Sequence, residues 1–174
     1  DKDIDENAVK NSELIFLEGY LWDEGDPKIA FNKAISISKK TAMSLSDKFC
    51  VNRHKKNFLD LVTNKLDITF ANEQEILSLI NAKNFKEVIS FAKQIEKLIV
   101  VTRGEKGSIA IQKNNVFECD SNKNIKVKDL TGAGDLFAAG FLNGYVNNLM
   151  IENSLQMGTD MASKIIQKIG ARLN

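Results

Sequence analysis

Length, composition and charge limit the classes of protein to which the chain can belong. Its 174 residues suit one domain with a sizeable core, and its 43% apolar and 27% charged residues are typical of soluble globular proteins. A net charge of +1 gives no indication of binding to nucleic acid or to an anionic membrane surface. No apolar run is as long as a transmembrane helix, and no signal-peptide pattern opens the chain.

Short apolar runs alternate with helical periodicities along the first hundred residues. The runs at 14–17, 42–46, 67–71 and 98–102 predict buried strands. Apolar residues at helical spacing predict a helix beginning near Pro27, a helix over 52–65, one through Ile76 and Ile80, and one over 85–97. Because this alternation implies right-handed β-α-β crossovers, we predict an α/β fold whose mostly parallel sheet is covered by helices on both faces.

After residue 102 the pattern changes to short strands joined by tight polar turns. Strands are predicted at 108–112, 116–119 and 125–127, and they would add a short antiparallel portion to the sheet. Two helices, over 132–148 and 152–169, close the chain. No internal repeat or low-complexity tract interrupts these elements, so we predict a single α/β domain over 1–174.

A glycine-rich loop leads directly into the first of the two closing helices. Gly132, Ala133 and Gly134 let the backbone approach a ligand closely, and the helix start adds unpaired N–H donors. Asp135 lies about one turn in, where a carboxylate can accept a proton from an attacking hydroxyl. The loop lacks the third glycine of a dinucleotide fingerprint and the Gly-Lys-Ser/Thr triplet of a P-loop. An ordinary helix start with a dipole-complementing Asp135 is the alternative.

The longer pattern Asp-x-Thr-Gly-Ala-Gly-Asp, followed by an aromatic and small residues, resembles the second signature of the ribokinase-like (PfkB-type) carbohydrate kinases. This resemblance implies a ribokinase-like fold. It also implies that Asp135 is the catalytic base and that the backbone of Gly132, Ala133 and Gly134 forms the anion hole. More loosely, the segments at 19–23 and 169–172 resemble a bacterial adenosine-kinase-like branch.

Two other clusters follow predicted strands, where ligands gather in open α/β sheets. Asn72 and Glu75 have the spacing of a helix capping box, and they also resemble the family's Asn-x-x-Glu motif, which tunes Mg²⁺ and phosphate binding. Both roles are compatible. Thr102, Gly104 and Gly107 resemble the family's Thr-x-Gly-x-x-Gly nucleotide loop, whereas a plain turn is the alternative.

The resemblance also implies roles for three further residues. Asp129 and Thr131 match positions where several family members hold a monovalent cation, which would be K⁺, beside the anion hole. Thr159 lies where relatives often place a residue that contacts adenine, although a helix-surface threonine is an equal alternative.

Histidine and cysteine give no further site in the sequence. His54 is the only histidine, with no carboxylate beside it in the sequence, so we predict a solvated surface residue rather than a triad member or metal ligand. Cys50 and Cys119 are too few and too far apart to indicate a disulfide framework or a zinc site, which predicts a reduced, cytoplasmic setting.

Members of the family are considerably longer, so the resemblance implies that the chain is a carboxy-terminal, nucleotide-binding half whose amino-terminal half and lid are absent. The expected activity is ATP- and Mg²⁺-dependent phosphoryl transfer to a primary hydroxyl of a sugar or nucleoside. The half alone is expected to be nearly inactive, and the full-length form is a possible homodimer. The alternatives are a nucleotide-binding module without catalysis, or a phosphomethylpyrimidine or pyridoxal kinase of related fold.

Overall fold

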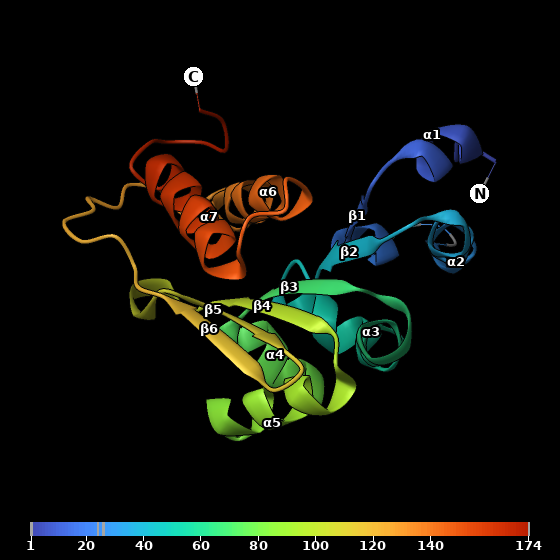
Figure 1. The fold of residues 1–174 in the computed structure, drawn as a ribbon, viewed down its shortest axis with the longest axis horizontal. Helices are drawn as coiled ribbons and strands as arrows, with labels where there is room; N and C mark the ends of the chain where they lie inside the picture. Colours follow the sequence, from blue (N-terminus) through green and yellow to red (C-terminus); the bar gives the residue numbers. More distant parts are fainter. Residues whose placement is uncertain (1, 24, 26, 174) are drawn as a thin grey trace. The chain divides into compact units, whose positions relative to one another are not determined.

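A computed structural model describes residues 2–23, 25 and 27–173 of the chain (Figure 1). Its strands form a six-stranded mixed sheet with the order β1-β2-β3-β4-β5-β6. The chain divides into two compact units, the first comprising residues 1–99 and 111–114 and the second comprising residues 100–110 and 115–174.

The first unit contains parallel strands that alternate with helices, as the sequence predicts. Ile15 of the first strand lies opposite Thr41 of the second, and Ala42 of the second lies opposite Ile68 of the third. Ala42 and Ile68 are fully buried, which confirms the prediction of buried parallel strands for the second and third strands. Residues 15–18 of the first strand are only half-buried, so the prediction that this strand is buried is wrong. The elements are α1 (Glu6–Asn11), β1 (Ile15–Glu18), the 3-10 helix η1 (Gly19–Asp23), α2 (Pro27–Ile37), β2 (Thr41–Ser44), α3 (Lys48–Asp60), the π-helical turn η2 (Leu61–Lys65), β3 (Ile68–Asn72), α4 (Glu73–Ile80) and α5 (Phe85–Ile95).

The second unit contains the later strands and the two closing helices. The connections 103–107 and 113–114 are too short for a parallel crossover, so the strands that they join are antiparallel. This agrees with the predicted antiparallel portion. The elements are β4 (Leu98–Thr102), the 3-10 helix η3 (Gly104–Lys106), β5 (Ser108–Gln112), β6 (Asn115–Cys119), α6 (Ala133–Val146) and α7 (Ile151–Ile165); the unit boundary falls within β4 and β5.

Side-chain caps explain where several helices begin. Asp47 accepts a hydrogen bond from the Cys50 N–H at 2.6 Å and begins α3, and Asn84 accepts from two N–H groups at the start of α5. Inside α3, His54 leaves helical geometry, with φ −113° and ψ 19°. The helix is therefore kinked at this residue.

Glycines allow α6 and α7 to pack at close range. A Cβ atom at Gly140 would lie 2.6 Å from the carbonyl oxygen of Met157, and one at Gly158 would lie 2.8 Å from that of Phe137. Neither position has room for a larger residue without movement of the backbone. This packing fixes α6, whose first turn carries Asp135.

Two predictions about where elements lie are wrong, and one helix lies where no element is predicted. Residues 125–127 are not a strand; the next residues instead bond to the end of α7, where the Ile166 carbonyl accepts from the Lys128 N–H at 2.7 Å. The helix predicted over 52–65 begins earlier, at Lys48, because Asp47 caps it. The polar opening of the chain, for which no element is predicted, forms the short helix α1 with Asp5 as its N-cap. None of the helices in the described part of the chain is long and apolar enough to cross a membrane.

Candidate active site

The start of α6 has the backbone that the predicted anion hole requires. Gly132 is the N-cap residue in the left-handed conformation, with φ +77°, and it has no side chain to cap the helix. The Ala133 N–H donates to the Leu130 carbonyl at 3.1 Å. Among the described residues, the N–H groups of Gly134 and Asp135 make no hydrogen bond to the backbone outside the helix or to a capping side chain. These two donors and the positive helix end are therefore available to an anionic group.

The space around this loop is open on one side and filled on the other. A Cβ atom at Gly134 would meet nothing within 4 Å, and the Asp135 side chain is exposed in the first turn. A Cβ atom at Gly132 would lie 3.0 Å from that of Ala171, so the carboxy-terminal segment packs directly against the loop at Gly132. Asp135 and the free N–H groups thus lie together where a ligand can reach them.

Asp129 fastens the loop to the carboxy-terminal segment. Its carboxylate accepts from the Thr131 N–H at 2.9 Å and the Thr131 hydroxyl at 2.7 Å, while the Gly170 N–H donates to the other oxygen at 2.8 Å. These hydrogen bonds lower the pKa of Asp129 to about 2, and the bond from the Gly170 N–H has the largest effect. The geometry gives Asp129 a positioning role, and cation binding by Asp129 and Thr131 remains a prediction.

The predicted nucleotide loop has one glycine in open space and one under a strict packing constraint. Gly104 has φ +60°, and a Cβ atom there would meet nothing within 4 Å, whereas a Cβ atom at Gly107 would overlap the carbonyl oxygen of Cys119. The loop closes through the Arg103 N–H, which donates to the Gly107 carbonyl at 2.8 Å. Thr102 ends β4 directly before it.

Thr159 lies inside the second unit, which excludes the helix-surface alternative. Its side chain is 7% exposed, and its hydroxyl lies 3.2 Å from that of Ser108 and 3.6 Å from the Cys119 sulfur. The hydroxyl therefore joins α7 to β5 and β6. A contact of Thr159 with adenine stays a prediction.

Asn72 and Glu75 form the predicted capping box in the first unit. The Glu75 N–H donates to the Asn72 side chain at 2.9 Å, and the Asn72 N–H donates to the Glu75 carboxylate at 2.9 Å. Glu75 is 4% exposed, and burial raises the pKa of its carboxyl to about 7. Bonds from Asn72 oppose this shift, while nearby Asp47 and Glu18 add to it.

We expect the protein without divalent cations to lose stability as the pH rises from about 4.5 to about 7, because Glu75 binds its proton more tightly when folded. The stabilisation is fully present below the pKa of Glu75 in the unfolded chain, and it is lost as the pH rises through the pKa of Glu75 in the folded protein. Its size is on the order of 3 kcal/mol. Urea unfolding at several pH values should show this fall for the parent protein and not for Glu75→Gln. Equal slopes for the two proteins would contradict the prediction.

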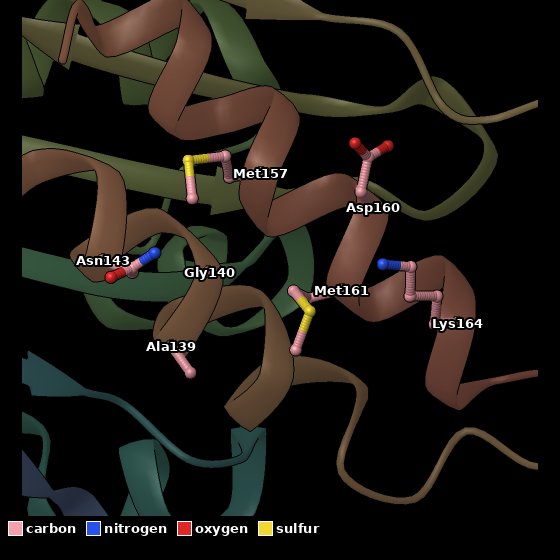
Figure 2. A pocket seen from close by; sticks show the side chains of 7 residues that line it. All are labelled: Ala139, Gly140, Asn143, Met157, Asp160, Met161 and Lys164. Atoms are coloured by element: carbon pink, nitrogen blue, oxygen red, sulfur yellow. The ribbon is translucent and has the colours of Figure 1, made fainter. Parts of the chain in front are cut away.

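A cavity of about 330 Å³ opens between α6 and α7 (Figure 2). Met157 and Met161 of α7 and Ala139 of α6 line it, with Asp160 and Lys164 at one side. It contains none of the predicted site residues, and no motif in the sequence indicates it.

The prediction that His54 is a solvated residue without a carboxylate partner is wrong. Its Nε2 lies 2.8 Å from a carboxylate oxygen of Asp23, and its ring packs beside Trp22 and Phe58. Asp23 precedes His54 by 31 residues, so no local spacing could have shown the pair. Arg53 also donates to the Asp23 carboxylate.

Comparison with known proteins places the chain in a family. All of its residues, 1–174, match the family described as pfkB family carbohydrate kinase. It is 31% identical over 118 residues to a cytidine kinase from Thermococcus kodakarensis, covering 67% of the chain and 42% of that protein. It is 30% identical over 150 residues to a nucleoside kinase from Methanocaldococcus jannaschii, covering 86% of the chain and 49% of that protein.

A solved structure shares both fold and sequence with the chain. The adenosine kinase from Sinorhizobium meliloti superposes with a TM-score of 0.95 and 37% identity, covering 99% of the chain and 54% of that protein. The chain thus spans about half the length of the relatives that it matches. With the fold, the family match and the α6 loop in agreement, the chain belongs to the pfkB family of carbohydrate kinases.

Proposed function

We propose that the chain is the nucleotide-binding half of an ATP-dependent kinase that phosphorylates a primary hydroxyl of a sugar or nucleoside. The observation that carries this proposal is the start of α6, where an exposed carboxylate and unpaired N–H groups lie in one helical turn. A phosphoryl group in transfer needs both a stabilised negative charge and a base for the attacking hydroxyl. The family match supports the reaction class, and the acceptor itself stays open between sugars and nucleosides.

Each predicted residue has a role in this mechanism. Asp135 accepts the proton of the attacking hydroxyl. The backbone of Gly132, Ala133 and Gly134 surrounds the transferring phosphoryl group, and its free N–H groups stabilise the charge there. ATP lies against the loop from Thr102 to Gly107. Thr159 adds a contact to the adenine, and Asp129 with Thr131 would hold a monovalent cation, K⁺, beside the anion hole.

The resemblance to the Asn-x-x-Glu motif assigns Mg²⁺ to Asn72 and Glu75, which follow β3. Asn72 and Glu75 would hold Mg²⁺ through its waters, since this ion keeps much of its hydration shell. The hydrated ion would neutralise charge on the ATP phosphates. A solved Escherichia coli structure of the same fold, 21% identical to the chain, contains ATP and Mg²⁺.

The 174-residue chain alone is expected to turn over far more slowly than the full-length kinase. Acceptor positioning and water exclusion need the remaining half of the length that relatives have, and both effects are large parts of kinase catalysis. A nucleotide-binding module without catalysis is the competing function. Acceptor-dependent ADP release by the full-length protein separates the two.

ATP or ADP with Mg²⁺ is expected to bind weakly even to this half, and Gly104→Ala should weaken that binding by about tenfold or more. The added methyl group would project into open space where the phosphates are proposed to lie. Titration calorimetry measures the effect. Gly25→Ala is the matched control, because Gly25 also has a positive φ of 68° and open surroundings but lies outside the loop. Absence of binding at millimolar nucleotide, or equal loss in both variants, would count against the site.

A further inference from the structure

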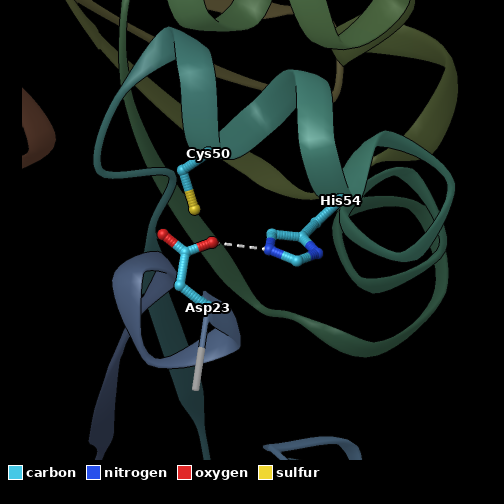
Figure 3. A group of neighbouring side chains, drawn as sticks. All are labelled: Asp23, Cys50 and His54. Carbon is cyan, nitrogen blue, oxygen red and sulfur yellow. Dashed lines mark hydrogen bonds and ion pairs between the residues drawn. The ribbon is translucent and has the colours of Figure 1, made fainter.

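Besides the residues proposed for the kinase site, three side chains of different chemistry converge between η1 and α3 in the first unit. Figure 3 shows Cys50 and His54 projecting from successive turns of α3 toward Asp23, which ends η1. A carboxylate oxygen, the thiol sulfur and a ring nitrogen all lie within 4.8 Å of one another. The four-residue spacing of Cys50 and His54 puts both on one face of a helix, as in helical metal-binding motifs.

We propose that Asp23, Cys50 and His54 bind a Zn²⁺ ion that ties η1 to α3. Sulfur, imidazole nitrogen and carboxylate oxygen are the three ligand types that Zn²⁺ takes in proteins. Mg²⁺ takes oxygen ligands only, so this site is chemically distinct from one for the ATP-bound metal. Ligand atoms around tetrahedral Zn²⁺, with bonds of about 2.0–2.3 Å, lie roughly 3.5 Å apart. The present separations need only small side-chain movements to close on the ion.

The surroundings of the three residues suit this site. Arg53 donates to Asp23 at 3.0 Å through Nε and through a second nitrogen, which orients the carboxylate as an outer partner of a ligand does. Trp22 and Phe58 pack beside the His54 ring and hold it in place. The helix kink at His54 turns the ring out of regular helical geometry. Two of the three ligands are therefore held in position before any metal arrives.

Burial and charge set the conditions for an ion at this position. Cys50 is fully buried, His54 is partly buried and Asp23 is exposed, so the site has an inner end and an open end. Burial raises the pKa of the Cys50 thiol to about 11, so the thiolate forms only as the metal binds. A thiolate and a carboxylate bring two negative charges to Zn²⁺, and Arg53 shares the Asp23 carboxylate with the ion, so the group carries a net charge of about +1. With three protein ligands, a water molecule completes the tetrahedron at the open end.

Binding is balanced without any redox step, because Zn²⁺ keeps its oxidation state. The thiol proton of Cys50 passes to solvent as the sulfur–metal bond forms. The His54 Nε2 gives up its hydrogen bond to Asp23 and bonds to the metal, so the neutral ring carries its proton on Nδ1. The thiol also leaves its present bond to the Gly19 carbonyl, which is 3.3 Å long.

The chain's composition makes the site testable without ambiguity. It contains one histidine and two cysteines, so any site that uses both residue types must include His54. Tag-free protein, freed of metal by a chelator, is titrated with Zn²⁺ against a coloured competitor and with Co²⁺ as a spectroscopic substitute. We expect one ion per chain, a thiolate-to-cobalt charge-transfer band with tetrahedral visible bands, and a higher melting temperature with Zn²⁺.

Matched variants assign the ligands. Cys50→Ser should abolish the charge-transfer band. His54→Gln should weaken Zn²⁺ binding by at least about tenfold, because losing a residue that only hydrogen-bonds to a metal ligand already costs that much. Cys119→Ser, which removes the other thiol, should change neither. If Cys50→Ser does not fold, the loss of Zn²⁺ affinity in His54→Gln still tests the proposal, because His54 is only partly buried. Binding that is absent, unaffected by His54→Gln, or lost in Cys119→Ser would overturn the proposal.

Discussion

Asp135→Asn is expected to lower kcat of the full-length kinase by about 10²–10⁴-fold, the usual cost of losing a general base. Asn is nearly isosteric and keeps its place in the first turn of α6, but it cannot accept the proton of the attacking hydroxyl. The structural loss is limited to part of the interaction with the helix dipole, which is under about 1 kcal/mol at an exposed position. Nucleotide affinity and melting temperature should therefore change little.

A steady-state assay with purified full-length protein, together with thermal unfolding, measures both effects. Glu152→Gln is the matched control, because Glu152 is also an exposed carboxylate in the first turn of a helix, α7, but is not among the residues of the proposed site. It should leave kcat unchanged and shift the melting temperature as little as Asp135→Asn does. An Asp135→Asn protein that melts early yet keeps near-normal kcat would show that Asp135 only stabilises its helix.

Gly107→Ala is expected to destabilise the protein by about 2–5 kcal/mol, since it combines backbone strain with overpacking. Gly107 has φ +82° and ψ −143°, a region that residues with a Cβ atom rarely adopt. The added Cβ atom would overlap the Cys119 carbonyl, which belongs to the rigid end of β6 rather than to a flexible side chain. The loop or the strand would have to move.

Gly104→Ala in the same loop separates the two causes of this loss. Gly104 also has a positive φ, but its surroundings are open, so strain alone should cost about 1–2 kcal/mol. Urea unfolding of both variants gives the comparison. If the two variants lost equal stability, the close approach of the Cys119 carbonyl to Gly107 would not be a constraint in solution.

Features set by local sequence were predicted correctly. β4 and β5 have the predicted bounds, because each contains a short apolar run that ends at polar residues or glycine. The capping box of Asn72 and Glu75 follows from residue types three positions apart. The loop at Gly132 was also recognisable, since its glycines and Asp135 are adjacent in the chain.

Features that depend on distant segments could not be predicted in this way. The segment at 125–127 looks like a strand by composition, but the chain beyond it bonds to the end of α7, about forty residues later. The pairing of His54 with Asp23 arises because η1 and α3 pack together, and no spacing in the sequence reports that packing. The same packing brings Cys50 into the group, although the number and spacing of the cysteines give no indication of a zinc site.

The most direct test of the kinase assignment is ADP release by the full-length protein with ATP, Mg²⁺ and a panel of nucleosides and sugars. We expect that at least one acceptor stimulates release, and that the same acceptor lacking its primary hydroxyl does not. The phosphorylated product should carry its phosphate on that hydroxyl oxygen. If no acceptor stimulates release while ATP still binds, the protein is a nucleotide-binding module and the proposed phosphoryl transfer is wrong.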